Sequence, residues 1–288
     1  MQFGGIRAVD DASITVEGGR VQGLIGPNGA GKTTTFNIIT GLQEPTSGQV
    51  FIDGEDVTRL PVHERARKGM ARTFQRLEVF GSLSVFDNVR VSAEIHDRWG
   101  HPEGKPRDIA QEMLERVGIT EWANVQADSV PTGIARMTEL ARALAQRPRL
   151  VLLDEPGSGL NEEEAEEFGT LLLSLADEGM GVLMVEHDVD LVMRVCSWID
   201  VLDFGRNIAS GTPEQIKNDP KVQEAYLGAD LDENDNGVLD FFEDDEVVAG
   251  AAPSAARAGE PSDPQPGETF IGEDGVEYEY VYDDEESS

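Results

Sequence analysis

The chain has 288 residues, of which 39% are hydrophobic, so it can bury a core. It carries 56 acidic residues against 23 Lys and Arg, a net charge of −33 at pH 7. That balance excludes binding to nucleic acid or to an anionic membrane through net charge. No apolar run approaches the roughly 18 residues that span a bilayer, and the first residues lack a signal-peptide pattern. Cys196 is the single cysteine, which excludes an intramolecular disulfide. We therefore expect any membrane attachment to come through a partner.

The acidity is spread unevenly along the chain. Residues 230–288 hold 20 acidic side chains and one basic one, Arg257, whereas residues 1–229 hold 36 acidic and 22 basic. An acidic body with an acidic tail is typical of proteins from salt-loving organisms, where carboxylates keep their hydration while salt screens their repulsion. We favour this halophile interpretation over an ordinary acidic protein with an interaction tail.

Apolar and alternating runs predict the elements in chain order. We expect strands at 12–17, 20–25, 49–52, 150–153, 181–185, 199–202 and 207–209. A helix is expected at 36–42, ending near Gly41, and most of 61–147 is helical in pattern, with breaks at 100–106 and 131–133. Strands that alternate with helices predict an α/β fold with a mostly parallel sheet covered on both faces. The first two strands predict an antiparallel β subdomain, and residues 76–147 an inserted helical subdomain.

A glycine-rich loop follows the strand at 20–25. It reads Gly26-Pro27-Asn28-Gly29-Ala30-Gly31-Lys32-Thr33 with Thr34 next, and it fits G-x-x-x-x-G-K-[ST] between a strand and a helix. Such a loop turns successive backbone N–H groups toward one anion. We expect it to bind a nucleoside triphosphate, with Lys32 across the β- and γ-phosphates and the Thr33 hydroxyl on Mg²⁺.

Two carboxylates, Asp154 and Glu155, end the apolar strand at 150–153. One can serve Mg²⁺ through water while the other polarises the attacking water. Acidic residues that merely end a buried strand are the alternative, which is weak for a pair behind a phosphate loop.

The order of five short elements resembles the nucleotide-binding subunits of ABC transporters, a P-loop NTPase type. After the phosphate loop come Arg72-Thr73-Phe74-Gln75 and then Gly133 ahead of residues 138–144. The carboxylate pair follows, and after it come Ser158-Gly159-Leu160-Asn161 and finally Val185-Glu186-His187-Asp188. The resemblance covers about residues 3–228. It is strongest to the LivG-type subunit of branched-chain amino acid importers, and a urea or amide importer is nearly as good a match.

The resemblance implies a task for each matching position. Phe3 would stack on the adenine, Gln75 would reach Mg²⁺ and sense the membrane subunit, and Glu155 would be the catalytic base. His187 would contact the γ-phosphate, and residues 76–147 would dock on the membrane subunit. The cofactors implied are ATP and Mg²⁺. The partners implied are a second ABC subunit, transmembrane permease subunits and, indirectly, an extracytoplasmic binding protein, which places the chain at the cytoplasmic face of the membrane.

Two positions depart from the family pattern. The signature loop, normally Leu-Ser-Gly-Gly-Gln, is Val130-Pro131-Thr132-Gly133-Ile134 here, so Pro131 supplies neither a hydroxyl nor an N–H at the serine position. Gly133 remains. This favours a heterodimer with unequal sites over a homodimer. Met1 lies only two residues before Phe3, and we expect that the natural chain starts earlier, the alternative being a sheet without its edge strand.

The acidic tail contains a separate motif. Residues 232–243 fit the EF-hand loop pattern, with calcium ligands expected from Asp232, Asn234, Asn236, the Val238 carbonyl, Asp240 and Glu243. A solvated acidic turn is the alternative, and it is favoured. Residues 229–266 are expected to be an acidic linker and 267–288 an acidic tail with a hairpin.

Three functions follow from the sequence. The leading one is an ATPase that energises an importer. Its rivals are a soluble ABC ATPase without a transport role, disfavoured because only one cassette is present, and a regulatory subunit, disfavoured because Glu155 and His187 are intact. The transported substrate cannot be deduced from this subunit, since selectivity resides in others.

Overall fold

The computed structural model describes residues 1–100, 104–227, 269–271 and 277–279. The chain divides into two units, Met1–Asp245 and Glu246–Ser288. In the second unit, β11 (Thr269–Ile271) pairs antiparallel with β12 (Glu277–Glu279). The predicted calcium loop and the predicted linker lie outside the described residues.

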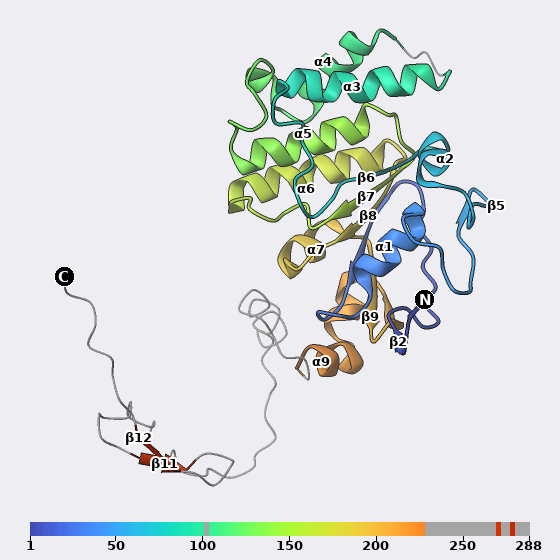
Figure 1. The fold of residues 1–288 in the computed structure, drawn as a ribbon, viewed down its shortest axis with the longest axis vertical. Coiled ribbons are helices and arrows are strands. Elements are labelled where there is room, and N and C mark those ends of the chain that lie inside the picture. Colours follow the sequence, from blue (N-terminus) through green and yellow to red (C-terminus); the bar gives the residue numbers. More distant parts are fainter. Residues whose placement is uncertain (101–103, 228–268, 272–276, 280–288) are drawn as a thin grey trace. The chain divides into compact units, whose positions relative to one another are not determined.

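A six-stranded sheet forms the centre of the first unit (Figure 1). Its strands, in spatial order, are β10 (Arg206–Gly211), β9 (Trp198–Asp203), β3 (Arg20–Ile25), β8 (Gly181–Val185), β7 (Leu150–Asp154) and β6 (Met70–Arg72). All neighbours pair parallel except β10 and β9, which pair antiparallel. The parallel strands all end at the same edge, which brings the segments that follow them together.

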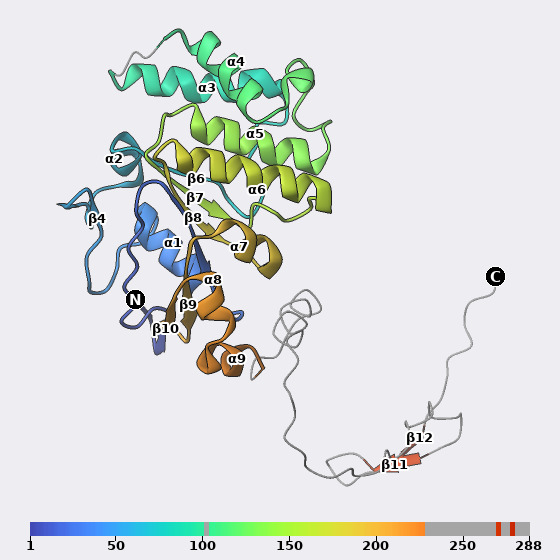
Figure 2. The same ribbon diagram turned by 180° about the vertical axis from the view of Figure 1, so that it is seen from behind.

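Helices cover both faces of this sheet. The helices of the described residues are α1 (Lys32–Thr40), α2 (Val62–Arg67), α3 (Val85–Arg98), α4 (Pro106–Arg116), α5 (Thr132–Leu144), α6 (Glu162–Asp177), α7 (Val189–Val195), α8 (Pro213–Lys217) and α9 (Pro220–Leu227), with a 3₁₀ turn at Thr120–Trp122; of these, α3 and α4 pack on each other and on α5. Figure 2 shows α8 and α9 beside β9 and β10. No helix within the described residues is both long and apolar enough to cross a membrane.

Strand alternation divides the core into two clusters. Val151 and Leu153 of β7 pack with α5, α6 and α7, whereas Leu152 between them packs with Phe36 of α1. All four side chains are at most 2% exposed. Because successive side chains of a strand point to opposite faces, the continuous apolar runs are explained by a sheet buried on both sides. The predicted fold class, with its mostly parallel sheet, is confirmed.

Small antiparallel pairs accompany the main sheet. β1 (Gln2–Phe3) pairs with β2 (Ile6–Arg7), and β4 (Phe51–Ile52) pairs with β5 (Glu55–Asp56). The β4–β5 connection is Asp53-Gly54, whose φ angles of 49° and 78° are those of a two-residue hairpin turn. In the interval 76–147, α3 packs against both α4 and α5.

The structure corrects three expectations. Residues 12–17 form no strand, although Ile14 and Val16 pack against the α1 side of the core. The expected antiparallel pairing of 12–17 with 20–25 is therefore wrong, because β3 pairs parallel with β8 and β9 on its two sides. The edge strand β6 lies inside the interval that was expected to be mostly helical. The break predicted at 131–133 is narrower, since α5 already begins at Thr132.

Candidate active site

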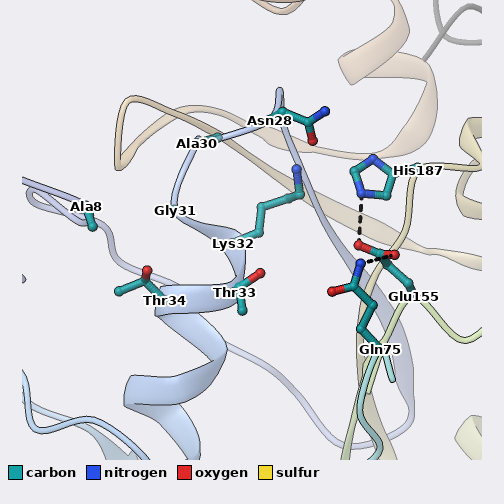
Figure 3. Close-up of a pocket in the computed structure, with 11 residues that line it drawn as sticks. Ala8, Asn28, Ala30, Gly31, Lys32, Thr33, Thr34, Gln75, Glu155 and His187 are labelled. Carbon is teal, nitrogen blue, oxygen red and sulfur yellow. Dashed lines mark hydrogen bonds and ion pairs between the residues drawn. The ribbon is translucent and has the colours of Figure 1, made fainter. Parts of the chain in front are cut away.

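A cavity of about 450 Å³ opens at the edge where the parallel strands end (Figure 3). The segments after β3, β6, β7 and β8 all reach it. Its lining residues are Ala8, Asn28, Gly29, Ala30, Gly31, Lys32, Thr33, Thr34, Gln75, Glu155 and His187. All but Ala8 are residues that the sequence predicts for the site, although they come from four segments far apart in the chain.

Two glycines allow the loop after β3 to fold closely against its neighbours. Gly26 has φ 146°, and a Cβ there would lie 2.0 Å from the carbonyl oxygen of Leu202. Gly31 has φ 102°, and a Cβ there would lie 2.3 Å from the carbonyl oxygen of Ala8. No other residue type fits either position without moving backbone. The loop therefore packs closely against the end of β9 on one side and the segment around Ala8 on the other.

Helix α1 begins directly at the loop and offers an anion-binding end. Gly31 is its N-cap, without a side-chain hydrogen bond, and the first turn holds no acidic residue. The first amides of a helix have no carbonyl partner within it and carry the positive end of its dipole. Lys32 adds a cation that is 8% exposed, and its Nζ donates to the carbonyl oxygens of Gly26 and Pro27. This arrangement can hold a polyphosphate.

Three side chains meet on the opposite wall of the cavity (Figure 3). His187 Nε2 lies 3.0 Å from Glu155 Oε1, and Gln75 Nε2 donates to Glu155 Oε2 at 2.7 Å. The hydrogen bond with His187 is the main reason why the pKa of Glu155 lies below its ordinary value. Glu155 also has φ 49°, a left-handed backbone that is uncommon outside glycine and is found at functional sites. An ionised carboxylate, fixed at both oxygens, therefore faces the phosphate loop.

Asp154 does not line the cavity. It is 3% exposed, and its Oδ2 accepts from Arg72 Nη2 at 2.6 Å. The Arg72 guanidinium also donates to Asn37 Oδ1 of α1 at 2.8 Å and lies 5.0 Å from the centre of the Phe74 ring. Arg72 therefore joins the end of β7 to the helix that follows the phosphate loop.

Side chains of α5 hold the segment that carries Gln75. Arg136 donates to the carbonyl oxygens of Phe74 at 3.0 Å and Gln75 at 2.7 Å. Glu139 accepts from the backbone N–H of Glu78 at 2.6 Å, and burial raises the pKa of its carboxyl. The position of Gln75 is thus tied to the helix that begins at the signature stretch.

The signature stretch itself lies away from the cavity lining. Pro131 is the N-cap of α5 and makes no side-chain capping bond, and Gly133 is in the first turn of the helix. A Cβ on Gly133 would lie 2.7 Å from Glu164 Oε1, so a larger residue would displace that carboxylate. The adenine contact expected of Phe3 depends on a side chain that is outside the described part of the structure.

Two residues at the site were not singled out from sequence. Ala8 contributes backbone and a small side chain, for which a sequence carries no signal. Arg72 lies in the segment that ends at Gln75, but the motif implies no role for it. It pairs with the buried carboxylate of Asp154 on the neighbouring parallel strand, a relation that no spacing along the chain encodes.

Comparison with known proteins decides the family. Residues 9–158 match the ABC transporter family, and residues 206–232 match the branched-chain amino acid ATP-binding cassette transporter family. The chain belongs to the ABC transporter ATP-binding family. It is 40% identical to the high-affinity branched-chain amino acid transport ATP-binding protein BraF of Pseudomonas aeruginosa, over 79% of this chain and 94% of BraF. It is 38% identical to the lipopolysaccharide export system ATP-binding protein LptB of Escherichia coli, over 80% of this chain and 94% of LptB.

Solved structures of ABC cassettes share the fold. The ADP conformation of MJ1267, an ATP-binding cassette of an ABC transporter, superposes with a TM-score of 0.71 at 28% identity, covering 80% of this chain and 96% of MJ1267. The dimeric post-hydrolysis state of the cassette MJ0796, bound to ADP and Pi, gives a TM-score of 0.65 at 26% identity, covering 72% and 91%. This ABC cassette is an ATP-hydrolysing subunit of a family whose members work as dimers with transmembrane permease subunits.

Proposed function

We propose that this ABC cassette energises an importer of branched-chain amino acids. The observation that carries the proposal is the match of residues 206–232 to the branched-chain amino acid cassette family. The cassette as a whole does not decide the cargo, because the identity to LptB, an export subunit, is close to that to BraF. Residues up to Leu227 of this segment form the edge strand β10 and the helices α8 and α9, which contact it.

The phosphate loop would bind the triphosphate of ATP. Residues 28–34 line the cavity, where their backbone amides would bind phosphate, and Lys32 would exchange its bonds to the Gly26 and Pro27 carbonyls for phosphate oxygens. Ammonium–phosphate contacts are charge-assisted, so this exchange favours the nucleotide-bound form.

Mg²⁺ fits the oxygen groups around this cavity. The Thr33 and Gln75 side chains line it and offer hydroxyl and amide oxygens, which Mg²⁺ takes, whereas Asp154, at the end of β7 and bonded to Arg72, would serve the ion through water. No cluster of three or more His, Cys, Asp or Glu residues able to hold a metal occurs in the described residues, which fits an ion held mainly by phosphate and water. When bound, the ion would neutralise phosphate charge during hydrolysis.

Hydrolysis would use Glu155 as the base that orients and deprotonates water. Its bond to His187 keeps the carboxylate ionised at neutral pH, as a base must be. His187 extends from the end of β8 on the same side of the cavity and would contact the γ-phosphate. Gln75 would link the nucleotide to the segment held by Arg136 and hence to the partner that docks near α3–α5.

The second ATP-binding subunit would be a different chain. Pro131 caps α5 without a hydroxyl or an N–H, so this chain presents a weakened signature to the partner's nucleotide. The phosphate loop of this chain, closed by an intact signature of the partner, would then do most of the hydrolysis. Replacing Glu155 by Gln in such a heterodimer should nearly abolish turnover. If most activity survives, the hydrolysing site is the other one.

Transport assays separate the candidate cargoes. The chain would be purified with candidate permease and binding-protein subunits, placed in vesicles with ATP inside, and supplied with leucine, valine, urea or acetamide. We expect leucine and valine to stimulate ATP hydrolysis and uptake, with Glu155→Gln vesicles as the inactive control. Stimulation by urea or acetamide alone would assign the urea or amide importer, the alternative that the sequence resemblance leaves open. Assembly with export permeases alone would contradict an import role.

Three further proposals accompany this function. The chain would lie at the cytoplasmic face of the membrane, held there by permease subunits. The charge of −33 would adapt it to high salt, so its unfolding temperature should rise steeply with KCl up to molar concentrations. Calcium binding at 232–243 would appear as heat in a calorimetric titration of the whole chain, lost in Glu243→Gln.

A further inference from the structure

Glu186 is a buried acid that the mechanism above leaves unused. It lies between the end of β8 and His187, is 6% exposed, and does not line the cavity. A carboxyl buried to this degree is costly unless its oxygens are bonded. The hydrogen-bond partners of its two carboxyl oxygens therefore indicate its role.

Each oxygen of Glu186 binds a different loop. Oε1 accepts from the backbone N–H of Gly157, and Oε2 accepts from the backbone N–H of His187 at 3.2 Å. Gly157 belongs to the loop of residues 156–161, which runs from Glu155 to Asn161, the N-cap of α6. The carboxylate thus bridges the loop behind the base Glu155 and the loop that carries His187.

The close approach of Gly157 to Glu186 favours a residue without a side chain at position 157. A Cβ on Gly157 would lie 3.0 Å from Glu186 Oε1 and 3.2 Å from Leu191 Cδ2. Leu191 is fully buried in α7, so its side chain has little room to move aside. The far end of the 156–161 loop is fixed as well, because Asn161 and Glu164 cap α6 through reciprocal hydrogen bonds of 3.0 and 2.9 Å. Since both ends of the loop are held, a change in the bond from Gly157 to Glu186 would shift residues 156–161 together.

The surroundings of Glu186 make the protonation of this carboxyl, and with it the bridge, sensitive to pH. Burial raises the pKa of Glu186 to about 7, the two backbone bonds oppose that shift, and the nearby carboxylates of Asp188 and Glu155 add to it. His187 and the buried thiol of Cys196 are the other titratable groups close by, and the pKa of that thiol is raised by burial and by Glu186. A neutral glutamine offers one acceptor oxygen where the carboxylate offers two.

We propose that Glu186 is a positioning residue that ties loop 156–161 to His187, so that movement of His187 at the nucleotide is passed to this loop. The inference rests on the roles proposed above for Glu155 and His187. Glu186 touches no substrate and acts only through the two loops.

Hydrogen exchange in the isolated full-length chain tests the bridge without any activity. We compare Glu186→Gln and Glu186→Ala with wild type, and use Asp190→Asn, an exposed acid in the same segment, as the matched control. In Glu186→Ala, the exchange rate should rise about tenfold in the peptides covering 155–161 and in those covering 186–190. In Glu186→Gln, it should rise about tenfold in at least one of these two segments. Unchanged exchange in both segments would overturn the proposal.

ATPase kinetics of the assembled transporter test the positioning role. Glu186→Gln should lower kcat about tenfold while KM for ATP stays within about twofold, because the nucleotide contacts remain. The kcat of wild type should change between pH 6 and 8 with a step that Glu186→Gln lacks. An unchanged kcat and pH profile would overturn the role even if exchange rises. Absence of leucine stimulation in wild type would instead count against the proposed cargo, which the exchange experiment does not involve.

Discussion

The pair Arg72–Asp154 gives the sharpest stability prediction. Its two side chains are 7% and 5% exposed and their charged atoms are 2.6 Å apart. Removing one partner of a buried pair leaves the other charge desolvated and unpaired, which costs about 3–5 kcal/mol. Arg72→Met also loses the bond to Asn37, so we expect its free energy of unfolding to fall by about 4 kcal/mol.

A double-mutant cycle isolates the charge effect. Urea unfolding followed by tryptophan fluorescence would compare Arg72→Met, Asp154→Asn and the double variant with wild type. The double variant carries no unpaired charge, so it should recover about half or more of the loss in Arg72→Met. Arg194→Met serves as the control, because its pair with Glu166 is 3.7 Å long with side chains 45% and 68% exposed, and it should cost at most about 1 kcal/mol. The reasoning is refuted if Arg72→Met behaves like Arg194→Met, or if the double variant is no more stable than Arg72→Met.

Three other predictions follow from single positions. Folding raises the pKa of Glu186 from 4.5 to about 7. The protonated form of Glu186 therefore stabilises the folded state fully below pH 4.5, and this stabilisation is lost as pH rises through 7. Between pH 4.5 and 8, wild type should therefore lose up to about 3 kcal/mol more unfolding free energy than Glu186→Gln, and parallel pH curves for the two would contradict this. The free energy of unfolding should fall by about 2–3 kcal/mol in Gly31→Ala, because the new Cβ would meet the carbonyl oxygen of Ala8. In the control Gly48→Ala, at φ 97° with open space around it, it should fall by only about 1 kcal/mol, and thermal unfolding would show whether the two differ. Pro131→Ser should stabilise α5 by about 0.5–1 kcal/mol as an N-cap and raise heterodimer ATPase activity, and an activity equal to wild type would count against unequal sites.

The sequence predicted the parts of the fold whose signal is local. β7 and β8 are apolar runs that could be recognised because a sheet buried on both faces needs them, and β3 could be recognised between Gly18-Gly19 and the glycine-rich loop. The segment 12–17 alternates apolar and polar residues but gains no strand partner, which only the tertiary arrangement decides. β6 is three residues long and was missed because its strand character comes from pairing with β7.

Candidate site residues could be named where a motif fixes both residue type and position. Residues 28–34, Gln75, Glu155 and His187, which the ordered set of motifs singled out, lie around one cavity. Arg72 and Glu186 could not be assigned, because their partners are a buried carboxylate on another strand and two backbone N–H groups. Such roles depend on distances across the sheet edge, and no spacing along the chain encodes them.

The central claim is that the loop between β3 and α1, with Lys32, binds the triphosphate of ATP. Affinity for a fluorescent ATP analogue and ATP turnover would be measured with Mg²⁺ in molar KCl, for wild type, Lys32→Ala and the exposed-lysine control Lys105→Ala. We predict that Lys32→Ala loses about 100-fold or more in affinity and all detectable turnover, while Lys105→Ala matches wild type. Undiminished affinity and turnover in Lys32→Ala would contradict the account.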